Sequence, residues 1–128
     1  MADPRFLSIE DVMEIHVDQI NRYGGRVGVR DVELLQSAIG MPESGFGDQY
    51  LHADLFEMAA AYLFHIVQDH PFVDGNKRTG AMAAFVFLKL NGRTLTGSES
   101  AFEKIVLQAA EGQIGKDVVA EFFRKHAR

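Results

Sequence analysis

The chain is organised around one polar stretch, His70-Pro71-Phe72-Val73-Asp74-Gly75-Asn76-Lys77-Arg78-Thr79-Gly80. The stretch contains an imidazole, a carboxylate, an amide, a lysine and an arginine, and it lies between two long apolar segments. Charged and polar groups in a hydrophobic environment are costly unless they have partners. We therefore expect these side chains to form a site with a chemical role.

The segment before the stretch predicts a helix that begins at Asp54 and ends at Asp69. Glu57 stands at the capping-box position relative to Asp54, and apolar residues follow at helical spacing. Because Pro71 disfavours the helical conformation for the residue before it, His70 is expected just past the helix end, in a non-helical backbone.

The segment after the stretch predicts a helix from Asn76 or Lys77 to Leu90. Residues 81–88 are apolar on every side, which is typical of a buried helix. We expect this helix to be the central one of the fold.

Four other segments also predict helices, so the chain is expected to form one all-α domain over residues 1–128. The expected helices run from Ser8 to Tyr23, from about Arg30 to Ile39, from a box of Ser100 and Glu103 to Gly112, and through Val118, Val119, Phe122 and Phe123. Between them, Pro42, Gly45 and Gly47 interrupt the helical pattern of residues 41–52. That segment is either a surface loop or a flap, with a small hairpin at residues 43–51, beside the active site.

The composition excludes several classes of function. The chain has no cysteine, so it has no disulfide, no thiolate nucleophile and no cysteine metal site. The formal net charge of −5 argues against general affinity for nucleic acid or for an anionic membrane. The longest apolar run, residues 81–90, is far shorter than the ~20 residues that cross a bilayer. A reducing cytoplasm fits this composition.

Residues 75–78 stand at the start of the predicted second helix, where the first amides have no intrahelical partner and favour phosphate. Gly75 allows close approach of the backbone, Lys77 adds charge, and Arg78 can make two bonds to one phosphate. Alone, this run does not favour a phosphate site over an ordinary helix start that carries solvated basic residues. The Walker spacing is absent.

Asp74 precedes this phosphate site, and a carboxylate beside a phosphate requires a cation between them. Mg²⁺ is the natural candidate, although Asp74 taken by itself is more typical of a helix cap. His70, at a helix–loop junction, could take a proton from a hydroxyl group that attacks the bound phosphate. The order of base, metal ligand and phosphate contacts is a specific signal.

The stretch resembles the motif of the Fic/Doc family, which in Fic proteins reads His-x-Phe-x-Asp/Glu-Gly-Asn-Gly-Arg-x-x-Arg. The matching residues are His70, Phe72, Asp74, Gly75, Asn76 and Arg78. Lys77 and Ala81 stand where Fic proteins have glycine and arginine, and both departures are similar to the Doc (death on curing) branch. Residues 22–25, 54–57 and 90–92 also look Doc-like, so the resemblance covers nearly the whole chain.

The resemblance implies a compact helical bundle with a flap that presents the target chain, and it implies ATP and Mg²⁺ as cofactors. His70 would be the general base and Asp74 the Mg²⁺ ligand. The phosphate-binding residues would be Gly75, Asn76, Lys77 and Arg78.

The resemblance also implies an activity. Fic proteins mostly transfer AMP to hydroxyl side chains, whereas Doc toxins phosphorylate a threonine of elongation factor Tu and stop translation. Lys77 fills the space that the Fic glycine leaves for the α- and β-phosphates, so a nucleotide bound in the reverse direction would offer its γ-phosphate. Ala81 also lacks a contact used in AMP transfer. A Doc-like protein kinase toxin is therefore favoured.

Other interpretations stay open at this point. They are a Fic-like AMP transferase and a non-catalytic binding module. A metal hydrolase that uses His65, His70 and Asp74 is disfavoured, because His65 and His70 do not share one helical face. The inhibitory string Ser/Thr-x-x-x-Glu-Gly/Asn of some Fic proteins is absent, which agrees with a separate, Phd-like antitoxin as partner.

Overall fold

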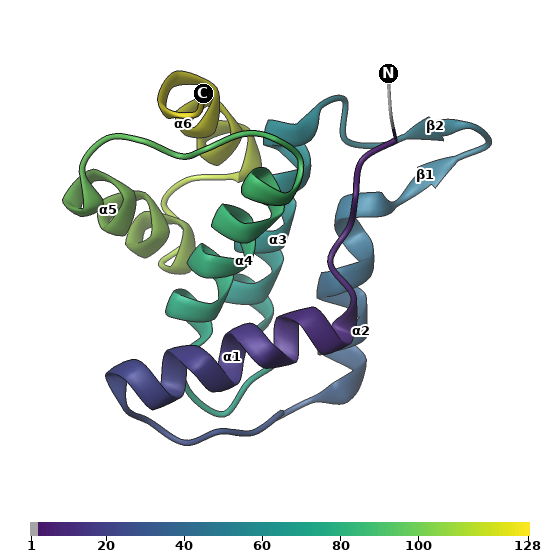
Figure 1. Ribbon diagram of the computed structural model, residues 1–128. Coiled ribbons are helices and arrows are strands. Elements are labelled where there is room, and N and C mark those ends of the chain that lie inside the picture. The colour runs from purple at the N-terminus through teal and green to yellow at the C-terminus, as the bar shows by residue number, and fades with distance from the viewer. Residues whose placement is uncertain (1–2) are drawn as a thin grey trace.

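The computed structural model describes residues 3–128. Within them the chain forms six α-helices, one short 3-10 helix and a two-stranded hairpin (Figure 1). The elements are α1 (Ile9–Tyr23), α2 (Val32–Gly40), η1 (Met41–Glu43), β1 (Gly45–Phe46), β2 (Gln49–Tyr50), α3 (Leu55–Asp69), α4 (Asn76–Leu90), α5 (Glu99–Ala110) and α6 (Lys116–His126). The predicted all-α class with a small hairpin is confirmed.

The helix at the centre of the bundle is α3. It packs against α2, η1, α4, α5 and α6, and eight of its fifteen residues are buried. α4 returns antiparallel beside it (Figure 1). It adds Ala83, Ala84, Phe87 and Leu88 to the same core. The sequence places α4 itself at the centre, but its Phe85 is only half-buried. The reason is that α3 covers one side of α4, whereas α1 and α5 cover the rest incompletely.

α1 lies across the N-terminal end of α4 (Figure 1). Its start follows the predicted pattern, because the Ser8 hydroxyl accepts a hydrogen bond from the Asp11 amide at 3.1 Å and the Asp11 carboxylate accepts one from the Ser8 amide at 2.8 Å. The segment before α1 is held by the Leu7 amide, which donates to the Tyr62 hydroxyl of α3 at 2.8 Å. These bonds fix α1 where it can contact the loop between α3 and α4.

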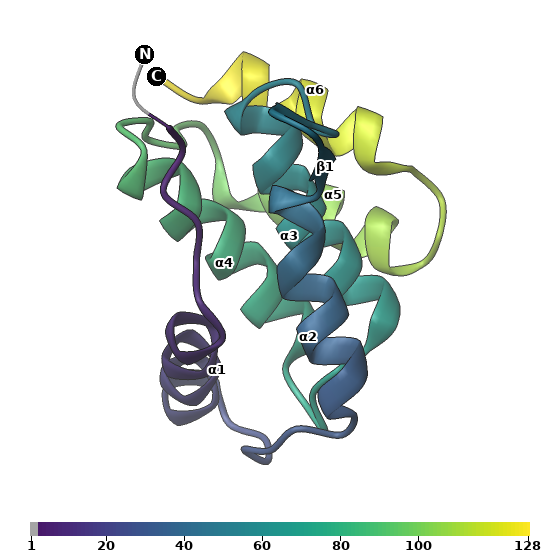
Figure 2. The same cartoon turned by 90° about the vertical axis from the view of Figure 1, so that its right-hand side faces the viewer.

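The hairpin forms as predicted, with Gly45 opposite Tyr50 and Phe46 opposite Gln49. Its position differs from the predicted flap beside the site. The hairpin stands before the N-terminal end of α3, whereas the α3–α4 loop leaves the C-terminal end (Figure 1 and Figure 2). His70 is the C-cap residue at that end. A helix of 15 residues is about 22 Å long, so the two are well separated. The segment beside the polar stretch is instead the connection between α1 and α2, where Val29 pairs with Phe72 in an isolated antiparallel bridge.

The start of α5 also differs from the prediction. Ser98 caps the helix by accepting a hydrogen bond from the Ala101 amide at 3.1 Å, so the expected box of Ser100 and Glu103 is wrong. Both serines fit a cap pattern locally. The choice follows from tertiary structure, because the Thr96 amide donates to the His126 carbonyl and thereby sets where the connector ends.

None of the helices within residues 3–128 combines the length and the apolar character needed to cross a membrane.

Candidate active site

The polar stretch forms the short loop between α3 and α4 and the first turn of α4. His70 is the residue that ends α3, with φ 50° and ψ 55°, in the left-handed conformation. The prediction of a non-helical backbone at the helix end is therefore confirmed. Its side chain is exposed, and the imidazole Nδ1 lies 3.5 Å from the Asn76 Nδ2, at the limit of a hydrogen bond.

Phe72 anchors the loop in the core, with only 1% of its surface exposed. Asn76 holds the same residue from α4. Its Oδ1 accepts from the Phe72 amide and its Nδ2 donates to the Phe72 carbonyl, both at 3.0 Å. The loop therefore occupies this buried side chain. The group of Asn76 that remains for the predicted phosphate contact is its backbone amide.

The start of α4 is suited to an anion. Gly75 precedes the helix with φ 72°, and no side chain caps the helix. The first intrahelical bond runs from the Thr79 amide to the Gly75 carbonyl, which leaves the amides of residues 76–78 without an intrahelical partner. A Cβ at Gly75 would lie 2.9 Å from the Ile20 Cδ1, so a larger residue here would adopt a strained backbone and would also displace the Ile20 side chain.

Asp74 and Arg78 both contact the turn that follows α1. The Asp74 Oδ2 accepts from the Arg26 amide at 3.0 Å, which leaves the second carboxylate oxygen for a ligand. The Arg78 Nη2 donates to the Gly24 carbonyl at 3.0 Å, and its guanidinium lies 5.5 Å from the centre of the Tyr23 ring. The structure thus places both charges at the same end of α4.

Lys77 is exposed in the first turn of α4, next to Arg78. The structure therefore brings His70, Asp74 and residues 75–78 into one region, at the junction of α3, α4 and the α1–α2 connection. The arrangement fits a nucleotide phosphate, because uncapped amides, a lysine and an arginine meet there. One carboxylate is present for a metal ion that the phosphates would share. The individual roles of these residues remain predictions.

His16 is a residue of this region that sequence reasoning did not identify. It is fully buried and stacks on Phe72, with ring centres 3.9 Å apart. The Gly28 amide donates to its Nε2 at 3.2 Å, so the proton lies on Nδ1, which faces the Thr79 hydroxyl at 3.2 Å. Burial lowers the pKa of His16, which keeps the ring neutral. Its spacing on α1 marks it as inward-facing, but only the fold shows that it supports the loop.

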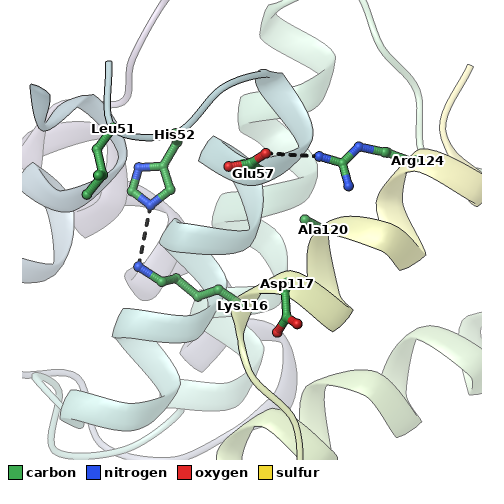
Figure 3. Close-up of a pocket in the computed structure, with 7 residues that line it drawn as sticks. All are labelled: Leu51, His52, Glu57, Lys116, Asp117, Ala120 and Arg124. Carbon is green, nitrogen blue, oxygen red and sulfur yellow. Dashed lines mark hydrogen bonds and ion pairs between the residues drawn. The ribbon is translucent and has the colours of Figure 1, made fainter. Parts of the chain in front are cut away.

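A second polar cluster lies between α3 and α6 and shares no residue with the first. The Lys116 ammonium of α6 lies 3.4 Å from the His52 Nε2 and 3.2 Å from the His65 Nε2. Figure 3 shows Lys116 directed at His52, and both line a cavity of about 560 Å³, with Glu57 and Arg124 paired nearby. Burial and the neighbouring Lys116 lower the pKa of His65 to about 4.

This cluster bears on the metal-hydrolase interpretation. His65 faces Lys116, so it does not converge with His70 and Asp74. Within residues 3–128, no three histidine, aspartate or glutamate side chains are grouped so as to hold a metal ion between them. The His65, His70 and Asp74 site is therefore not formed by the fold.

A groove of about 660 Å³ opens beside Arg78, between α1, α4 and α5. Its apolar lining comes from Tyr23, Ala81, Met82, Phe85, Leu95 and Phe102. Glu99 and Glu103 stand at the same groove. The small side chain of Ala81, the position at which Fic proteins have arginine, forms part of its wall.

Comparison with known proteins defines the class. The family model described as the Fic/DOC family matches residues 6–88. The "Protein kinase doc" of Escherichia phage P1 is 33% identical over 121 residues, which cover 94% of each chain. The "Toxin Doc" of Mycolicibacterium smegmatis is 40% identical over 70 residues, which cover 55% of this chain and 54% of that protein.

The chain therefore belongs to the Fic/DOC family. Both of these relatives carry the name Doc, and the lysine and alanine at positions 77 and 81 agree with it, so the chain groups with the Doc branch. The resemblance found in the sequence is confirmed.

Proposed function

We propose that this protein is a Doc-type toxin that transfers the γ-phosphate of ATP to a threonine hydroxyl of elongation factor Tu and so stops translation. The observation that carries the proposal is the uncapped, glycine-led start of α4, with His70 and Asp74 beside it. The full-length relationship to a relative named a protein kinase supports the same reaction. A target in translation would place the protein in the cytoplasm.

In this reaction the threonine oxygen bonds to the γ-phosphorus, the bond from that phosphorus to the bridging oxygen breaks, and ADP leaves. His70 takes the proton of the threonine hydroxyl, a role for which its exposed imidazole is accessible. The amides of residues 76–78, with Lys77 and Arg78, hold the phosphates and offset their developing charge. Asp74 would hold Mg²⁺, which neutralises phosphate charge when bound.

Lys77 is the reason to favour phosphate over AMP. The Fic motif has glycine at this position, and a lysine in the first turn of α4 fills space near the phosphates. A nucleotide bound in the reverse direction presents its γ-phosphate to the hydroxyl. Transfer of AMP is the second candidate. It uses a base, a carboxylate and an arginine, and all three are present in this sequence.

Intact-mass spectrometry of elongation factor Tu, after incubation with the protein, ATP and Mg²⁺, tests the proposal. We expect the mass of one phosphate to be added. His70→Ala should slow the transfer by about a hundredfold or more, because general-base catalysis contributes this much. The control is His126→Ala, which changes a half-buried histidine of α6 and should retain the activity.

The alternatives give different masses. Addition of AMP would replace the kinase by a Fic-like AMP transferase. No added mass on elongation factor Tu or on other translation proteins would favour a non-catalytic binding module.

We also propose that a Phd-like antitoxin silences the protein by covering the groove beside Arg78. Support comes from the apolar lining of the groove, from its position next to the proposed phosphate site and from the absence of an inhibitory string in the sequence. The same mass assay should lose its signal when the cognate antitoxin is added in equimolar amount.

A further inference from the structure

His70 has an unusual backbone. Among residues 3–128 it is the only residue other than glycine with a positive φ, and proline follows it. A side chain in the left-handed conformation is disfavoured because its Cβ crowds the following carbonyl. A residue that keeps such a conformation at a functional site must be held by its surroundings.

Arg30, in the connection between α1 and α2, donates hydrogen bonds to the backbone around His70. The Arg30 Nε donates to the His70 carbonyl at 2.7 Å, and its Nη2 donates to the Asp69 carbonyl at 2.9 Å. The Arg30 backbone amide donates to the Pro71 carbonyl at 2.7 Å. One residue thus binds three consecutive carbonyls on both sides of the strained position.

The location explains why an arginine is effective. The last carbonyls of a helix have no intrahelical partner and lie at the negative end of the helix dipole. A guanidinium adds positive charge there, and its planar fork can donate to two carbonyls at once, which an ammonium group at the same place cannot do in the same geometry. Arg30 is exposed, so packing does not confine its side chain, and these hydrogen bonds set its position.

The imidazole of His70 has little other support. On the α4 side, only the long 3.5 Å approach of Asn76 reaches the ring, and the two strong bonds of Asn76 hold Phe72 instead. The His70 amide is bound within α3 to the Ile66 carbonyl. On the carbonyl side, the Arg30 side chain binds the Asp69 and His70 carbonyls, and the Pro71 carbonyl accepts from the backbone amides of both Arg30 and Asp31.

We propose that Arg30 is a positioning residue: it holds the carbonyls of residues 69–71 so that His70 stays left-handed and directs its imidazole at the substrate hydroxyl. The inference rests on the proposed function for its catalytic consequence. Its structural part, the fixed orientation of the His70 ring, does not depend on the identity of the target.

Steady-state kinetics of Arg30→Ala at a temperature well below unfolding tests the catalytic part. We expect kcat to fall on the order of tenfold to a hundredfold, as a misplaced catalytic group causes, with the KM for ATP changed less than about twofold. Arg30→Lys keeps the charge without the fork and should recover part of kcat.

The matched control is Arg124→Ala. Arg124 is an exposed arginine near the opposite end of α3, where it pairs with Asp54, Glu57 and Glu121. Its loss should lower the unfolding temperature and leave kcat unchanged. A fall in kcat that is equal in Arg30→Ala and Arg124→Ala would reduce Arg30 to a stabilising residue and overturn the proposal.

NMR of the His70 ring provides a readout that needs no activity. The Hε1–Cε1 resonance of His70, assigned by comparison with His70→Gln, should move in Arg30→Ala and stay in place in Arg124→Ala. An unmoved resonance, or wild-type kcat in Arg30→Ala, contradicts the positioning role. If the wild-type protein transfers no group, the proposed function fails, and the NMR comparison still decides the inference about Arg30.

Discussion

Gly75 shows how the site depends on a single missing side chain. Its left-handed backbone directs the chain into α4, and the Ile20 side chain of α1 fills the place where a Cβ would stand. Two separate causes therefore oppose any substitution: the backbone conformation and the contact with Ile20. A second glycine allows the two to be separated, because Gly112 has φ 74° and open space around its Cβ position.

We predict that Gly112→Ala lowers the free energy of unfolding by about 1 kcal/mol, the typical effect of a side chain in the left-handed region. Gly75→Ala should lower the free energy of unfolding by about 1–3 kcal/mol more than Gly112→Ala does, since its Cβ overpacks against Ile20. Urea unfolding of both variants measures the difference. Equal losses would show that the contact with Ile20 relaxes without cost.

The placements that the sequence predicts well are those whose signal is local. The position of His70, Asp74 and Gly75 in one loop follows from their order in the polar stretch and from the proline and helix start around them. The occupation of Asn76 by Phe72, and the support from His16 and Arg30, depend on contacts between distant segments, which no local pattern encodes.

The helices illustrate the same limit for boundaries. α1 and α3 begin where their capping residues predict, because Ser8 and Asp54 have no competitor nearby. α5 begins two residues earlier than predicted, because Ser98 and Ser100 both satisfy the local rule and the α4–α5 connector, which is bonded to the end of α6, selects the first. The glycines and the proline of residues 41–52 predict the hairpin. They do not predict how far the hairpin lies from His70.

The cap assignment of α5 can be tested directly. Ser98→Ala should lower the free energy of unfolding by about 1 kcal/mol, because the Ala101 amide loses its acceptor. Ser100→Ala lies inside the helix and should change stability by only a few tenths of a kcal/mol, or slightly stabilise it. Urea midpoints of the two variants give the comparison. A larger loss of stability for Ser100→Ala than for Ser98→Ala would show that Ser100 is the capping residue.

The whole molecule should be sensitive to acid. Lys116 lies between two imidazoles, His52 and His65, whose pKa values are lowered chiefly by burial and then by the ammonium group itself. The neutral rings accept hydrogen bonds from the ammonium, and their protonated forms would repel it. The cluster joins α3 and α6, two elements of the core, so its state affects global stability.

The sign follows from His65, whose pKa falls from 6.5 to about 4 on folding. Its contribution is complete above pH 6.5 and is lost as the pH falls toward 4, because the unfolded chain takes up a proton first. The slope for one such group is at most about 1.4 kcal/mol per pH unit. Urea midpoints between pH 7.5 and 4.5 should fall less steeply in His65→Gln than in the wild-type protein, and parallel curves would contradict this assignment.

At this scale the sequence predicts the helical class and the family, since both depend on patterns that persist along the chain. It does not predict which helix is central. An apolar surface on all sides favours burial, but the number of neighbours that a helix receives depends on how the other helices pack. α3 receives more of them than α4 because η1, α2, α5 and α6 all contact it.

The separation of the hairpin from His70 has a practical consequence for biochemistry. The turn between β1 and β2 is exposed, with Phe46 at 94% exposure, and glycine stands at residue 47. Exposed loop tips of this kind tolerate insertions. A peptide tag placed in this turn would allow the protein to be immobilised on a sensor surface with the α3–α4 loop facing the solution.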